Sequence, residues 1–205
     1  MMPLAGEVEE LERRIQADLK KSFDYYEHTK IAWRLIQRLS DEGRPVSVEN
    51  IDTGTVVDGP TLASLAQGYV TGYLAESVFQ HLTTLFEDFL FGLLRCWLMA
   101  YPAAIPNKKD KPVDLATILD ANDRDAIIET VIDRELDALK YKRPAAWFKY
   151  LAEHIKLGGP TGDQIEQLSE IKASRDVLVH SRGIVNEIYL NKAGARARYA
   201  AGQRL

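Results

Sequence analysis

An arginine, a carboxylate and an imidazole occur within six residues of this chain, at Arg175, Asp176 and His180. An imidazole titrates near neutral pH and can therefore accept or donate a proton. Asp176 and His180 are four residues apart, so on a helix they share one face. A contact between them would fix the tautomer of the ring and favour its protonated form. This stretch is the first candidate for chemistry in the sequence.

Arg175 and His180 are five residues apart, which on a helix is about 140° around the axis and ~7.5 Å along it. One chain therefore has difficulty directing both side chains at one small group. Two chains related by a two-fold axis could bring the arginine of one copy to the histidine of the other. The spacing thus predicts a homodimer with a composite site, although it also fits an ion pair at a helix end beside a partly exposed histidine.

The candidate residues belong to the last turns of a helix predicted from about residue 163 to residue 181. Its apolar positions recur at helical spacing, at Ile165, Leu168, Ile171 and Leu178. Gly183 tolerates a left-handed conformation and should end or bend this helix. Asn186 can cap a short final helix that ends at Gly194.

The remaining chain is also predominantly helical in pattern. Helices are expected at about 7–39, 60–100, 113–121, 123–140 and 144–156, with a bend in the second at Gly68 or Gly72. Residues 46–59 switch to β-branched residues and turn formers, so they form a small hairpin or an extended loop. We predict one all-α domain over 1–205, a bundle of five to seven helices with two long ones, an irregular 46–59 insertion and a basic helix and tail over 186–205.

Composition narrows the class of protein. The net charge is −4, and Cys96 is the single cysteine, which suits a reducing compartment. The first residues are acidic and polar rather than a signal sequence, and the longest apolar run contains Arg95 and is too short to span a bilayer. We therefore expect a cytoplasmic protein without membrane contact. No metal-ligand or phosphate-loop motif occurs, so neither a metal nor another cofactor is expected.

The run SEIKASRDVLVHSRGIVNEIYLNKAG resembles the end of the HEPN family, whose mark is Arg-x4–6-His with a polar residue after the arginine. The segment RPAAWFKYL at 143–151 is also similar to the prokaryotic ribonuclease branch of that family (the RiboL-PSP and MAE types). The resemblance is specific over about residues 143–200. It implies an all-α HEPN-like fold with the motif at the end of a late helix.

The resemblance implies a metal-independent endoribonuclease. RNA carries its own nucleophile, the 2′-OH, so the protein needs a proton-transfer group and a fixed positive charge. His180 would be the acid or base, Arg175 would hold the phosphate, and Asp176 would orient His180. The products would end in a 2′,3′-cyclic phosphate, and two motif copies would meet at a dimer interface. Further contacts with RNA are expected from five residues: Ser174, Arg182, Lys192, Arg196 and Arg198.

Other functions remain open. Members of the wider family include non-catalytic RNA- or nucleotide-binding modules and toxin-like or defence proteins held by a cognate antitoxin. In one subgroup the motif is Arg-x4-His-x-Tyr and a partner nucleotidyltransferase modifies the tyrosine; Arg182 occupies that position here. A helical scaffold without a nucleic acid partner is a third possibility. Glu87 and Asp88, within an apolar stretch, could line a site or face solvent.

Overall fold

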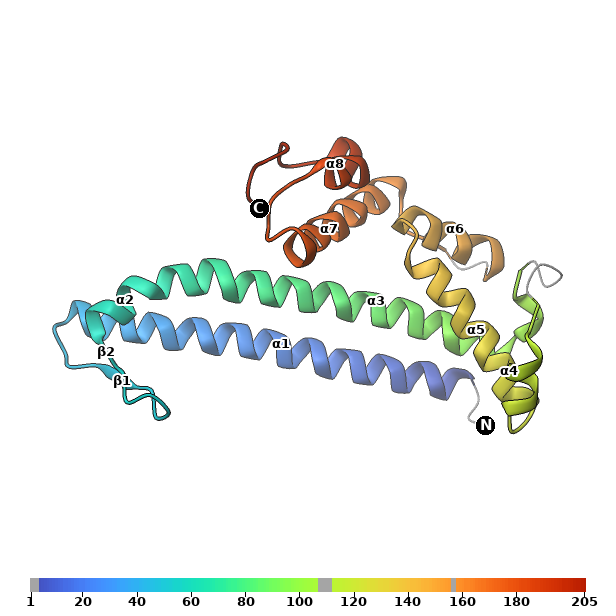
Figure 1. Ribbon diagram of the computed structural model, residues 1–205, viewed down its shortest axis with the longest axis horizontal. Coiled ribbons are helices and arrows are strands. Elements are labelled where there is room, and N and C mark those ends of the chain that lie inside the picture. The colour runs from blue at the N-terminus through green and yellow to red at the C-terminus, as the bar shows by residue number, and fades with distance from the viewer. Residues whose placement is uncertain (1–3, 107–111, 156–157) are drawn as a thin grey trace. The chain divides into compact units, whose positions relative to one another are not determined.

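The computed structural model describes residues 4–106, 112–155 and 158–205. The fold is all-α (Figure 1). The described chain has seven α-helices when the continuous helical stretch over residues 59–100 is counted as one. This confirms the predicted fold class. Internal contacts divide the chain into two compact units, Met1–Ile15 with Phe86–Leu205, and Gln16–Leu85. The predicted site lies in the first of these units.

Two long helical stretches each contribute residues to both units. Helix α1 covers Leu4–Asp41, as the apolar stripe predicted. The second stretch consists of α2 (Gly59–Gly68), a π-helical segment (Tyr69–Leu74) and α3 (Ala75–Ala100). The π-helical segment starts directly after Gly68 and contains Gly72, the two positions at which the sequence predicts an irregularity. Strands β1 (Ser47–Glu49) and β2 (Val56–Asp58) pair antiparallel, so the 46–59 insertion is a hairpin.

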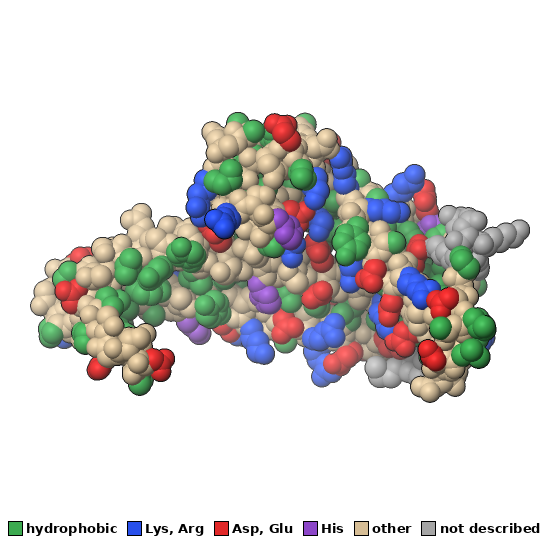
Figure 2. Space-filling model, in the orientation of Figure 1, with side chains coloured by type: hydrophobic (Ala, Val, Ile, Leu, Met, Phe, Trp, Pro, Cys, Tyr) green, Lys and Arg blue, Asp and Glu red, His purple; other side chains and the backbone are tan. Residues whose placement is uncertain are grey.

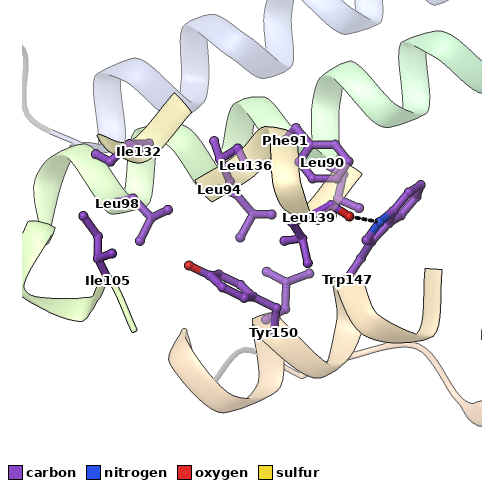
Figure 3. Close-up of a cluster of buried hydrophobic side chains, with 11 residues drawn as sticks. Leu90, Phe91, Leu94, Leu98, Ile105, Ile132, Leu136, Leu139, Trp147 and Tyr150 are labelled. Carbon is purple, nitrogen blue, oxygen red and sulfur yellow. Dashed lines mark hydrogen bonds between the residues drawn. The ribbon is translucent and has the colours of Figure 1, made fainter. Parts of the chain in front are cut away.

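The main core of the first unit lies between α3, α5 and α6. Helices α4 (Leu115–Asp120), α5 (Arg124–Lys140) and α6 (Pro144–His154) agree with the predicted helices, although the last predicted residue, Lys156, lies outside the described residues. Trp147 anchors this core (Figure 3): its indole Nε1 donates to the carbonyl of Leu139 at 2.8 Å, and its ring meets Phe91 edge-on. The core thereby fixes the junction between α5 and α6.

A second cluster joins α7 (Gly162–His180) to α8 (Glu187–Ala193). It contains small and medium-sized side chains and one buried ring, at Ala173, Val177, Val185, Tyr189 and Ala193. Helix α7 begins with a capping box between Thr161 and Gln164. As predicted, Asn186 caps α8 and Gly194 ends it.

The turn that follows α7 has two successive residues in the left-handed region. Gly183 has φ 77°, which agrees with the left-handed turn predicted there. Arg182 has φ 53°, and the sequence did not predict this conformation. The C-terminal segment then returns to this turn. The amide of Val185 donates to the carbonyl of Gln203, and the amide of Leu205 donates to the carbonyl of Gly183, each at 2.9 Å. The residues predicted as a tail therefore hold the backbone just beyond His180.

Candidate functional site

A hollow of about 590 Å³ lies in the first unit, where α5, α7, α8 and the start of the unit's α3 segment meet. Arg175, Asp176, His180 and Lys192, all predicted site residues, line it. Figure 2 shows basic, acidic and histidine side chains side by side on the visible face around α7. The structure thus brings together the three motif residues and one of the five further predicted contacts.

Arg175 and His180 reach the same hollow from one chain. The 140° helical separation does not keep them apart, because the arginine side chain is long and the hollow is wide. A site composed from two copies is therefore compatible with this geometry but is not required by it.

Asp176 is paired with cations rather than with His180. Its two carboxylate oxygens accept from Lys192 Nζ at 2.8 Å and from Arg175 Nη1 at 3.4 Å. Among the described residues, no hydrogen bond joins Asp176 to His180, so the expected orienting contact is absent from this conformation. The reason is that α8 places Lys192 beside Asp176, and the ammonium group makes a charge-assisted hydrogen bond to the carboxylate.

The surroundings of Asp176 keep it ionised. Burial opposes its charge, but the hydrogen bond and charge of Lys192, together with the charges of Lys172 and Arg175, outweigh this effect and lower its pKa below the ordinary 3.8. Since the folded-state pKa is the lower one, the stabilisation is fully present above the unfolded-state pKa. It is lost as the pH falls through the folded-state value.

This titration gives a testable pH dependence. Asp176→Asn should be less stable than the wild type at pH 6, because Lys192 and Arg175 lose their shared counter-charge. The difference in melting temperature should shrink as the pH falls below the ordinary 3.8 and through the lowered folded-state pKa of Asp176, because the wild-type carboxylate then becomes protonated as well. Thermal unfolding followed by circular dichroism over this pH series measures it. A difference that stays constant with pH would contradict the assignment.

Arg175 has unused binding capacity. Its Nε atom is buried and has no hydrogen-bond partner among the described residues, while the side chain as a whole is 26% exposed. A guanidinium presents five N–H donors, and here the charge is shared with one carboxylate at 3.4 Å. The exposed part of the guanidinium, rather than the buried Nε, is therefore able to bind an additional oxyanion in the hollow.

The sequence did not identify Lys172 and Glu87 as a pair at this site. Lys172 Nζ donates to Glu87 Oε1 at 2.6 Å, and the ammonium lies 5.1 Å from the centre of the Trp147 ring. Glu87, for which the sequence left both possibilities open, therefore lines the hollow, whereas Asp88 is exposed. A signal for Lys172 was present, because it precedes Arg175 by three residues and Asp176 by four and so shares their helix face.

Three of the expected RNA contacts have other partners. Ser174 is 3% exposed and its hydroxyl donates to Glu170 at 2.7 Å, so in this conformation the hydroxyl is not accessible to RNA. Arg198 Nε donates to the same carboxylate at 3.0 Å, and Arg196 pairs with the acidic side chains of α7's first turns. These two arginines keep exposed surface, but their charges are already balanced by carboxylates.

Glu170 is the centre of a buried polar network that the sequence did not predict. Its carboxylate accepts from Ser174, from the hydroxyl of Tyr189 at 2.9 Å and from Arg198. Tyr189 is 1% exposed, and burial is the main reason that the pKa of its hydroxyl is raised, with the Glu170 carboxylate adding to the shift. The network joins α7, α8 and the C-terminal segment beneath the hollow.

His180 is the last residue of α7 and is exposed. Within the described residues its side chain has no hydrogen-bond partner, so the ring is free to meet a ligand. Arg182, also exposed, follows in the left-handed turn but is not among the residues that line the hollow. The imidazole is accessible but is not held by another side chain.

Over 4–106, 112–155 and 158–205, no three His, Cys, Asp or Glu side chains gather into a metal-binding group. In the same ranges, no helix combines the length and apolar character that crossing a bilayer requires. Comparison with protein-family models, curated proteins and solved structures finds no match to this chain. The geometry around α7 is therefore the basis on which a function is inferred.

Proposed function

We propose that this protein is a metal-independent endoribonuclease of the HEPN type. The observation that carries the proposal is that Arg175 and His180 line one hollow, with the Arg175 side chain still 26% exposed. Lys172 and Lys192 add positive charge to the same walls. A fixed guanidinium beside an accessible imidazole is what cleavage through a 2′-OH requires.

The reaction starts with the ribose 2′-OH. His180 removes its proton, and the 2′-oxygen attacks the adjacent phosphorus. The bond from phosphorus to the 5′-oxygen breaks, and that oxygen takes up a proton from water as it leaves. His180 later returns its own proton to water, so the reaction consumes no net proton. The products are a 2′,3′-cyclic phosphate and a 5′-hydroxyl. Arg175 stabilises the negative charge that grows on the phosphoryl oxygens.

Asp176 takes a different role from the one first expected. It neutralises Arg175 and Lys192. A phosphate that enters the hollow competes with Asp176 for these cations, so the carboxylate acts as an internal counter-ion. RNA binding then rearranges the salt bridges, and catalytic hydrogen bonds form in the complex.

We further propose a homodimer in which the arginine of one copy serves the histidine of the other. Such an enzyme fits a toxin or defence role, with a cognate antitoxin covering the hollow. Control by a nucleotidyltransferase is not supported, because Arg182 stands where the modified tyrosine would be.

A non-catalytic RNA-binding module is the second candidate. Where the chain is described, His180 has no side-chain partner that would orient it, and this favours the second candidate, since a general base usually needs a fixed tautomer. This module would retain RNA in a salt-dependent way without releasing product.

The test is incubation of the purified protein with single-stranded RNA and with DNA of the same sequence, both in EDTA. We expect RNA fragments that end in a 2′,3′-cyclic phosphate, identified by mass spectrometry, and intact DNA, which lacks the 2′-OH. Cleavage of DNA, or dependence on an added metal ion, would contradict this mechanism. Binding without cleavage would select the second candidate.

A further inference from the structure

An exposed tyrosine stands where the site hollow meets a second hollow. The second hollow, of about 760 Å³, lies between the α5–α6 junction and α8. Both hollows are lined by Tyr141, Ile188 and Lys192, which form the rim between them. Tyr141 is 94% exposed and Ile188 is 64% exposed. Most of the surface of both side chains is therefore available to a ligand.

The backbone that carries Tyr141 is held firmly although its ring is exposed. Tyr141 caps α5, and α6 begins three residues later at Pro144. The carbonyl of Leu139 accepts from the amide of Lys142 at 2.9 Å and from Trp147 Nε1 at 2.8 Å. Because Trp147 is part of the buried core, this turn is anchored to it. A tyrosine ring on a fixed backbone loses little conformational entropy when it binds a ligand.

The charges that surround this rim favour the binding of a polyanion. Together the two hollows are lined by six Lys or Arg and four Asp or Glu, in a chain whose net charge is −4. In the second hollow, Lys142 is exposed and pairs with no carboxylate in the described part of the chain, and Arg143 donates to the amide oxygen of Asn191. These two cations are therefore not neutralised by acidic side chains.

We propose that Tyr141 is a base-stacking platform for single-stranded RNA. Lys142 and Arg143 contact the phosphates in the second hollow, across the rim from Arg175 and His180. This rests on the proposed function for the identity of the ligand as RNA. Stacking on an exposed ring requires an unpaired base, so the site selects single strands over duplexes. The second hollow then holds the nucleotides next to the scissile one.

The experiment measures the affinity for a short single-stranded RNA in EDTA by fluorescence anisotropy. A His180→Ala background keeps the RNA uncut. Tyr141→Ala should weaken binding by about 5- to 150-fold, the range of one base–aromatic stack. Tyr141→Phe keeps the ring and should stay within about twofold of the parent. Tyr101→Ala is the matched control, since Tyr101 is 54% exposed and is not among the lining residues of either hollow.

Binding of a ribose-phosphate oligomer without bases, measured for the parent and for Tyr141→Ala, completes a thermodynamic cycle. The effect of Tyr141→Ala should disappear on this oligomer, because there is no base to stack. An equal loss in Tyr141→Phe, a penalty that persists without bases, or an unchanged affinity in Tyr141→Ala would each overturn the platform.

The two proposals fail separately. RNA that is bound through Tyr141 but never cut by the otherwise wild-type protein removes the ribonuclease and keeps the platform. Cleavage whose KM is the same in Tyr141→Ala as in the wild type removes the platform and keeps the ribonuclease.

Discussion

His180→Ala should lower the rate of RNA cleavage by about 10²–10⁴-fold, the usual contribution of a general acid or base. His180 is exposed and ends α7, so its loss removes no buried contact and should leave the fold intact. The affinity for RNA should change little, because the cations of the hollow remain. Single-turnover cleavage in EDTA separates the chemical step from binding.

His154→Ala is the matched control for this variant. His154 lies in the same unit and meets the Tyr150 ring edge-on, with 4.6 Å between ring centroids, but it does not line the hollow. It should cleave RNA at nearly the wild-type rate. Cleavage that persists in His180→Ala, or an equal loss in both variants, would exclude His180 from the reaction.

Mixing two inactive proteins then tests whether the site is shared. If Arg175 of one copy serves His180 of the other, a mixture of Arg175→Ala and His180→Ala chains forms some mixed dimers with one intact site. After subunit exchange, about a quarter of the wild-type activity should return. No recovery, despite mixed dimers detected by mass spectrometry, would show that each chain uses its own pair.

Glu170→Ala should lower the free energy of unfolding by about 2–4 kcal/mol. The change leaves the hydroxyls of Ser174 and Tyr189 without their acceptor, and each unsatisfied buried group costs about 1–3 kcal/mol. Arg198 contributes less to this loss, because its side chain is 57% exposed and water can solvate it. Urea denaturation followed by circular dichroism measures the difference.

Glu166→Ala provides the comparison for Glu170→Ala. Glu166 lies one turn earlier on α7 and pairs with Arg196, but its side chain is 61% exposed. Exposed ion pairs contribute little, so the change should stay within about 0.5 kcal/mol. Equal destabilisation in the two variants would show that burial is not the cause.

The helices were predictable because their signals are local. The apolar stripe of α1, the Asn186 cap of α8 and the position of Gly183 after α7 depend on residues within a few positions of one another. The convergence of Arg175 and His180 on one hollow was not predictable from the angle between them. It depends on how far a flexible arginine extends and on how α8 packs against α7.

The partners of the carboxylates could not be predicted for a related reason. Asp176 is paired with Lys192, sixteen residues away, and Glu170 is paired with Arg198, twenty-eight residues away. In sequence, Glu170 has the appearance of an ordinary surface residue of a helix. Its burial follows from the position of Tyr189, which only tertiary packing determines.

The return of the C-terminal segment to Gly183 and Val185 restricts the backbone on the far side of His180, while α7 restricts it on the near side. The imidazole has no hydrogen bond to another side chain in the described ranges, and thus keeps rotation about its own side-chain bonds as its main freedom. Less orientational entropy is then lost when the ring aligns with a ribose hydroxyl. If His180 acts in the proposed reaction, the main chain provides part of the preorganisation that catalytic histidines commonly receive from a neighbouring carboxylate.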